Sequence, residues 1–239
     1  QNKLYLNEGS GVFIDDTRGP PPRLPITQEQ TDASAFGDVD KDGDLDLVII
    51  KWLSSRAATK ILLNDGKGFF VESLGAIPGI VNTHTPFSPQ LADLDGDTDL
   101  DLVLTSVGHV NNPNPAGIFI LANDGNGKFK VQVFIKELVL GDGSKARSYT
   151  VDVADIDGDR DLDVIADNRW CVMALETVLV NEGSFRFRPE KLSTYYNEPR
   201  NFICGSIVTT GEFNGDGKPD ILFTRTSSDY KPYGIALHK

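Results

Sequence analysis

Short apolar runs recur along the chain, and each one follows a stretch in which aspartate alternates with other residues. The run "LVII" follows Asp46, "LVLT" follows Asp101 and "ILFT" follows Asp220. Runs of this kind are too short for a helix and are rich in branched side chains, which predicts buried β-strands. Because no long stretch shows helical periodicity, the pattern predicts an all-β protein.

A second pattern keeps step with the first. The segments "LYLNEG", "ILLNDG", "ILANDG" and "VLVNEG" begin at Leu4, Ile61, Ile120 and Val178. Each is an apolar run that ends in Asn-Asp-Gly or Asn-Glu-Gly, where asparagine and glycine tolerate the positive φ of a tight hairpin turn. A strand after the hairpin and a strand before the next acidic segment complete four strands per unit, joined as a meander.

Together the two patterns define four repeats of about 58 residues. They account for the whole chain, so residues 1–239 are predicted to form a single domain. Four antiparallel strands in each repeat predict the blades of a β-propeller, and a one-dimensional stack of β-repeats is the alternative. The acidic segments and the hairpins are expected at the same face. The four acidic segments, called the first to fourth loops below, are 38–46, 93–101, 155–163 and 212–220.

The negative charge is concentrated in these loops. They hold 18 of the chain's 35 acidic residues, whereas the formal net charge of the chain is −12. This distribution favours ligand sets for metal over a solvating acidic surface. No basic run exists, which argues against nucleic-acid binding, and no apolar run approaches the ~18 residues that a membrane-spanning helix needs.

Alternating carboxylates are suited to calcium, which prefers six to eight hard oxygen ligands. An EF-hand loop begins in the same way, but it needs a glutamate at its twelfth position. Here that position holds an apolar residue in all four loops: Ile49, Leu104, Ala166 and Phe223. Solvated aspartate-rich turns without metal are the structural alternative, and the fourfold recurrence in phase with the strands argues against it.

The pattern D-x-D-x-D-G-x-x-D before a short apolar strand, with N-D-G-x-G-x-F about 20 residues later, resembles the FG-GAP or VCBS repeats of integrin-like β-propellers. The resemblance implies calcium bound by the side chains at loop positions one, three, five and nine and by the carbonyl of position seven. The implied ligands are Asp38, Asp40, Asp42, Asp46 and the Asp44 carbonyl; Asp93, Asp95, Asp97, Asp101 and the Asp99 carbonyl; Asp155, Asp157, Asp159, Asp163 and the Asp161 carbonyl; Glu212, Asn214, Asp216, Asp220 and the Lys218 carbonyl.

Two features depart from the family pattern. The glycine at position six is replaced by Thr98 and Arg160, for which positive φ is costly, so these loops are expected to bend at Gly96 and Gly158 instead. Propellers of the family often have seven blades, and the first and last strands of this chain have the same place in the repeat. This is typical of a segment of a larger array, with a closed four-bladed ring or assembly between chains as alternatives; the oligomeric state stays open.

The resemblance implies an extracellular recognition or adhesion module in which calcium is structural. The alternatives are a substrate-binding or catalytic propeller of a carbohydrate-active enzyme and a purely structural spacer. Only three histidines are present and none has a catalytic spacing, so we expect no enzyme activity. A protein or glycan partner is expected on the long loops opposite the metals, where the candidate ligand-binding residues are Trp52, His109, Arg169, Trp170 and Arg225.

The chain has two cysteines, Cys171 and Cys204. Both are expected near the face opposite the acidic loops, in adjacent repeats. An oxidising compartment would permit a disulfide between them, and two buried free thiols are the alternative.

Overall fold

The structure is a computed structural model of the 239-residue chain. It describes residues 3–17, 21–25, 30–53, 56–84, 86–106, 116–136, 148–168, 177–191, 203–227 and 232–238. Within these ranges the chain is all-β, as predicted, and its helical content is the single 3-10 turn η1, Val81–Thr83. No helix in these ranges is long and apolar enough to cross a membrane.

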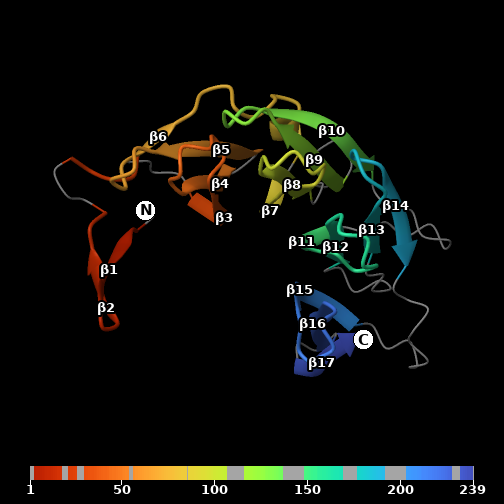
Figure 1. The fold of residues 1–239 in the computed structure, drawn as a ribbon. Coiled ribbons are helices and arrows are strands. Elements are labelled where there is room, and N and C mark those ends of the chain that lie inside the picture. The colour runs from red at the N-terminus through yellow and green to blue at the C-terminus, as the bar shows by residue number, and fades with distance from the viewer. Residues whose placement is uncertain are drawn as a thin grey trace.

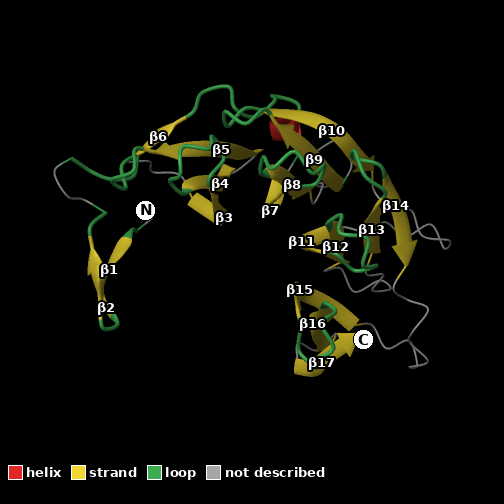
Figure 2. Ribbon diagram, viewed as in Figure 1, coloured by secondary structure: helices red, strands yellow, loops and turns green. Residues whose placement is uncertain are grey.

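The strands form one antiparallel sheet per repeat after an initial hairpin (Figure 2). The hairpin joins β1 (Tyr5–Gly9) and β2 (Val12–Asp15). The first sheet is β3 (Gln30–Gly37), β4 (Asp46–Leu53), β5 (Arg56–Asn64) and β6 (Phe70–Glu72). The second is β7 (Pro86–Ala92), β8 (Asp101–Ser106), β9 (Gly117–Asn123) and β10 (Phe129–Lys136). The third is β11 (Ser148–Ala154), β12 (Asp163–Asn168), β13 (Thr177–Asn181) and β14 (Phe187–Lys191). The fourth, of three strands, is β15 (Ile203–Gly211), β16 (Asp220–Ser227) and β17 (Pro232–His238).

Each sheet is a meander in which strands adjacent in sequence are hydrogen-bonded neighbours. The four sheets follow one another along an open arc, and β3, β7, β11 and β15 lie on its inner side (Figure 1). These inner strands of consecutive sheets contact one another. The sequence therefore predicted the four-stranded meander correctly for the first three repeats. In the described residues the fourth sheet has three strands and no closed ring is formed.

The core lies between the sheets, because the central strands are buried on both faces. Every residue of β8 is buried. Leu102 and Leu104 pack with β4 and β5 of the first sheet, whereas Val103 packs with the third sheet. Alternate side chains of one strand thus belong to two different cores, as the period of two requires. This explains why the runs after the aspartates are continuously apolar.

The meander brings the acidic loop and the hairpin to the same edge in each of the first three sheets. The first loop joins β3 to β4, and the hairpin with Asn64 joins β5 to β6. The backbone N–H of Asn64 donates a hydrogen bond of 2.9 Å to Asp46 Oδ1. The expectation that loops and hairpins share a face is therefore confirmed.

Candidate metal centres

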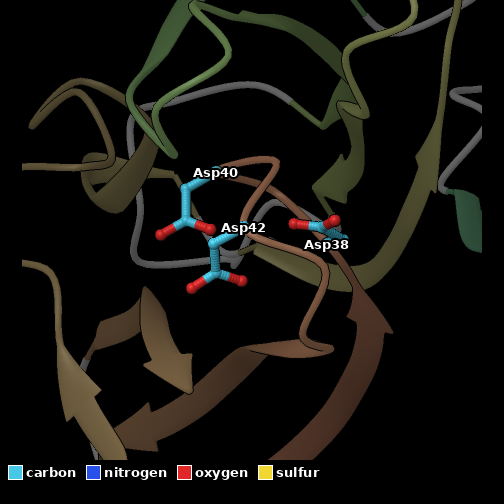
Figure 3. A group of neighbouring side chains, drawn as sticks. All are labelled: Asp38, Asp40 and Asp42. Atoms are coloured by element: carbon cyan, nitrogen blue, oxygen red, sulfur yellow. The ribbon is translucent and has the colours of Figure 1, made fainter. Parts of the chain in front are cut away.

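Three of the four acidic loops bring carboxylates together. In the first loop the oxygens of Asp38, Asp40 and Asp42 lie within 4.8 Å of one another (Figure 3). The second and third loops gather positions one, three and nine in the same way: Asp93, Asp95 and Asp101, and Asp155, Asp157 and Asp163. Position nine, Asp46, is not in the first group, and position five, Asp97 or Asp159, is not in the other two.

Local turns within each loop direct these side chains. Positions four and six have positive φ in all four loops, and their residues are Lys41 and Gly43, Gly96 and Thr98, Gly158 and Arg160, and Gly215 and Gly217. The expectation that Thr98 and Arg160 avoid positive φ is therefore wrong, since their φ angles are 73° and 81°. Their N–H groups donate hydrogen bonds of 2.9 and 3.0 Å to Oδ2 of Asp93 and Asp155. These bonds to position one offset the strain of the left-handed conformation, about 1–2 kcal/mol per residue.

Position five has a structural role in the same frame. Asp97 Oδ1 accepts a hydrogen bond of 2.8 Å from the N–H of Asp99, and Asp159 Oδ1 accepts one of 2.9 Å from Asp161. Asp42 Oδ1 accepts the equivalent bond from Asp44, also of 2.9 Å. These bonds hold position seven in the turn. The family resemblance assigns a ligand role to the backbone carbonyl of position seven.

In the first three loops, position nine joins the loop to the hairpin of its own sheet. In the second loop Asp101 Oδ2 accepts a hydrogen bond of 2.9 Å from Leu94 N–H, and its Oδ1 accepts one of 3.0 Å from Asn123 N–H. Asp163 makes the same pair of bonds with Ile156 and Asn181, both of 2.8 Å. The aspartate at position nine is thus fixed on both oxygens before any cation is considered.

The loop carboxylates are held in unfavourable surroundings for an anion. Burial raises the pKa of Asp101 to about 6, and it also raises the pKa of Asp46 and of Asp163. For Asp40 and Asp95, burial raises the pKa and neighbouring loop carboxylates raise it further. A nearby cation would favour the ionised form and reverse these shifts.

Two buried oxygens of the first loop indicate that its residues fit a cation. Asp38 Oδ1 and Asp40 Oδ1 are buried and have no hydrogen-bond partner. A buried polar atom without a partner costs free energy, and a hard cation would give both oxygens the contact that they lack. Since the donors are all oxygen, the set suits calcium rather than zinc or copper.

The fourth loop has the same backbone frame but a different centre. Phe213 N–H donates to Asp220 Oδ2 at 2.9 Å, as in the other loops. Glu212 Oε1 accepts hydrogen bonds of 2.9 and 2.6 Å from the N–H groups of Asn214 and Gly215, and Lys218 N–H donates to Asp216 Oδ1 at 2.9 Å. The acidic residues of this loop form no group within 4.8 Å of the kind found in the other three.

The hairpin asparagines have a function that sequence reasoning missed. Their predicted role was positive φ, but the hairpin residues with positive φ are the glycines together with Ser10, Ser184 and Phe185, and not the asparagines. Asn123 Nδ2 instead donates hydrogen bonds to Leu100 O at 3.1 Å and to Val39 O at 2.7 Å. Asn181 Nδ2 bonds Leu162 O and Leu94 O at 3.2 and 2.8 Å.

The carbonyls of Val39 and Leu94 belong to position two of the preceding repeat's loop. Asn123 and Asn181, called the inter-repeat asparagines below, therefore tie the first and second loops to the next sheet. The signal for this role was present in the sequence as asparagine recurring at one place in the repeat. Its partner could not be read there, because the partner lies more than 80 residues away.

The side chains of the candidate ligand-binding residues lie outside the described part of the structure. His109, Arg169 and Trp170 lie outside the described residues, as does Cys171. Trp52, Arg225 and Cys204 are in β4, β16 and β15, and the description covers their strands but not their side chains. The binding face and the disulfide therefore stay predictions.

Comparison with known proteins agrees with the sequence motifs. Residues 38–104, which include the first two loops, match the family model described as FG-GAP-like repeat. This segment is therefore an FG-GAP-like repeat. No curated protein matches it. Among 21 matching chains of solved structures is the V. cholerae biofilm matrix protein Bap1, with a TM-score of 0.44 and 15% sequence identity. That match covers 88% of this chain and 38% of Bap1.

Proposed function

We propose that this chain is an extracellular calcium-binding β-propeller module for recognition or adhesion, in which calcium stabilises the FG-GAP-like repeats. The observation that carries the proposal is the recurrence of one carboxylate site at the same place in consecutive sheets. Three loops each gather three carboxylates within 4.8 Å, and the first loop leaves buried oxygens of Asp38 and Asp40 without a partner.

Calcium fits the site better than other common cations. Each of these three loops offers several carboxylates and a carbonyl on a short turn, which suits the six to eight oxygen ligands and variable geometry of calcium. Magnesium demands a stricter octahedron and retains its water. When bound, calcium would supply positive charge that offsets repulsion among the loop carboxylates.

The propeller assignment rests on the arrangement of the sheets. Each of the first three is a four-stranded meander, and the first strands of consecutive sheets lie together on the inner side of the arc (Figure 1). This is the order that strands have in propeller blades, in which the first strand lies nearest the central axis. We propose that each sheet is a blade of a propeller.

A binding role is proposed rather than a catalytic one. His84, the histidine whose side chain is described, is buried. Its ring centroid lies 4.8 Å from that of Phe119 and 5.0 Å from that of Phe134, in edge contacts. A ring packed in this way is a core residue and is poorly placed for proton transfer with a substrate. The recognition face is proposed to be the one opposite the metals, where β4 ends near Trp52 and where the sequence predicts the long loop with Trp170, because long loops on a rigid scaffold commonly carry recognition.

Thermal unfolding in calcium and in excess chelator tests the calcium role. A ligand that binds only the folded state stabilises it by about 2.7 kcal/mol per site at 100-fold saturation. The melting temperature is therefore expected to rise with calcium concentration. Coincident curves after confirmed removal of metal would refute the proposal.

Glycan and protein arrays test the recognition role. The wild type is compared with Trp170→Ala and with Asp40→Ala, after circular dichroism shows that each variant folds. We expect Trp170→Ala to lose binding. Retention of binding by Trp170→Ala, with loss in a folded Asp40→Ala variant, would place recognition at the metal face instead.

A further inference from the structure

One lysine connects the first loop to the second. Lys41 occupies position four of its loop, where the other three loops have a glycine. Its Nζ forms an ion pair with Asp99 Oδ1 and donates a hydrogen bond of 3.1 Å to Thr98 Oγ1. Both partners belong to the second loop, so a charge from one repeat is placed beside the candidate metal site of the next.

The partner of Lys41 is held firmly. The side chain of Asp99 is only 10% exposed. It packs against the hairpin of its own repeat so closely that a Cβ added at Gly125 would lie 2.7 Å from Asp99 Oδ2. Since Asp99 is at position seven, where the carbonyl is the implied ligand, its carboxylate is available to Lys41. Lys41 therefore pairs with a carboxylate that is not one of the implied cation ligands, which are at positions one, three, five and nine.

The charge of Lys41 acts on the rest of the second loop as well. Its Nζ lies beside Asp99 and Thr98, in the same turn as the carboxylates of Asp93, Asp95 and Asp97, and attracts them. The attraction is mutual, so the ammonium group already neutralises part of the field that would draw a cation into this loop. A cation that binds in the second loop is therefore repelled by the charge of Lys41.

We propose that Lys41 lowers the calcium affinity of the second loop and so makes one repeat set the affinity of its neighbour. This inference rests on the proposed function, since it concerns the same calcium sites. Lys41 acts by its charge and is not a metal ligand. The second loop of this chain is therefore expected to bind calcium more weakly than its five aspartates would allow.

Calcium titration followed by the amide resonances of Gly96 and Gly158 tests the inference. The two glycines report the second and third loops in one sample. In Lys41→Gln, which removes the charge, the half-saturating calcium concentration at Gly96 is expected to fall about three- to tenfold, because a partly exposed charge has a modest effect. It should stay unchanged at Gly158.

Two control variants separate charge from shape. Lys41→Arg keeps the charge and should leave the Gly96 midpoint within about twofold of the wild type. Lys67→Gln removes a positive charge from the hairpin of the first repeat, at the same edge of the sheet, and should change neither midpoint. High salt should reduce the effect of Lys41→Gln, because salt screens exposed charges.

The possible outcomes are distinct. An unchanged or raised Gly96 midpoint in Lys41→Gln would overturn the role of Lys41 while leaving the calcium sites in place. An equal fall at Gly96 and Gly158 would also overturn it, because the effect would then not be specific to the second loop. Resonances in the wild type that do not respond to calcium would refute the proposed function and this inference with it.

Discussion

The third and fourth loops have the same turns but differ in what fills their centre. In the third loop Asp163 Oδ1 accepts its hydrogen bond from the backbone of Asn181, in the hairpin of the same repeat. In the fourth, Asp220 Oδ1 accepts a bond of 3.1 Å from Asn214 Nδ2, within its own loop.

Position three explains the difference. In the third loop it is Asp157, a carboxylate that joins those of positions one and nine. In the fourth loop it is Asn214, whose amide group reaches the position-nine carboxylate directly. The fourth loop thus supplies from its own position three the hydrogen bond that the hairpin supplies to position nine of the third loop. The same turn thus holds position nine either within a group of three carboxylates, where we propose that a cation binds, or against an internal amide.

The largest expected effect is the pH dependence of the calcium-free protein. Burial raises the pKa of Asp101 to about 6 from 3.8, so the folded state binds more protons than the unfolded state between these values. Stability should therefore fall as pH rises from about 4 to about 6.5, by about 3 kcal/mol for this group. Urea unfolding in chelator at a series of pH values measures the fall.

Saturating calcium provides the control for this prediction. Bound cation favours the ionised carboxylate, so the fall across the same pH range should disappear or reverse. A calcium-free protein whose stability rises from pH 4 to pH 6.5 would contradict the burial of ionised carboxylates in the clustered loops.

Removal of one carboxylate should distinguish the third loop from the fourth. Asp157→Ala is expected to abolish one calcium site and with it about 2.7 kcal/mol of calcium-linked stability at 100-fold saturation. Asp216→Ala, at position five of the fourth loop, should remove far less, because the acidic residues of that loop form no carboxylate group. Isothermal titration and chemical unfolding with calcium measure both effects. An equal loss in the two variants would remove the distinction between the loops.

The inter-repeat asparagines should contribute more to the free energy of unfolding than an asparagine whose side chain bonds a loop of its own repeat only. Asn181 is fully buried and bonds two carbonyls, so Asn181→Ala should destabilise by about 2 kcal/mol by leaving both without a partner. Asn64 Nδ2 bonds Leu45 O in its own repeat at 3.1 Å, and Asn64→Ala is the control, with an expected loss of about 1 kcal/mol. Urea unfolding of both in calcium compares them, and a larger loss for Asn64→Ala would speak against the inter-repeat role.

The smallest expected effect is a gain of calcium binding in the fourth loop. Asn214→Asp replaces the internal amide with a carboxylate, which adds ligand charge at position three and removes the bond to Asp220. The calcium affinity of this loop should rise by about tenfold, since ligand charge tunes such sites over wide ranges. The Gly215 amide resonance reports binding. A calcium response that is the same in Asn214→Asp and in the wild type would show that the amide does not decide the state of the loop.

Much of the fold followed from the sequence because its determinants are local. The strands after the aspartates, such as β4 and β8, were predicted from short apolar runs, and the meander from hairpin signals at a constant place in the repeat. The alternation of aspartates predicted a carboxylate group in all four loops, and such groups form in the first three, because side chains of one loop meet through turns a few residues long. The positive φ of Thr98 and Arg160 was not, since the hydrogen bonds that stabilise it depend on the complete turn.

What the sequence alone determined, then, is the repeat itself: its strands, its hairpins and the acidic loops between the first and second strands, all set by interactions within about ten to twenty residues. Only the tertiary structure decided how one repeat acts on the next. The bonds of Asn123 to Val39 and of Asn181 to Leu94, and the ion pair of Lys41 with Asp99, join side chains to loops that lie far away in sequence. These contacts arise because packing of the inner strands sets neighbouring sheets side by side, and no periodic pattern along the chain records which side chains then meet.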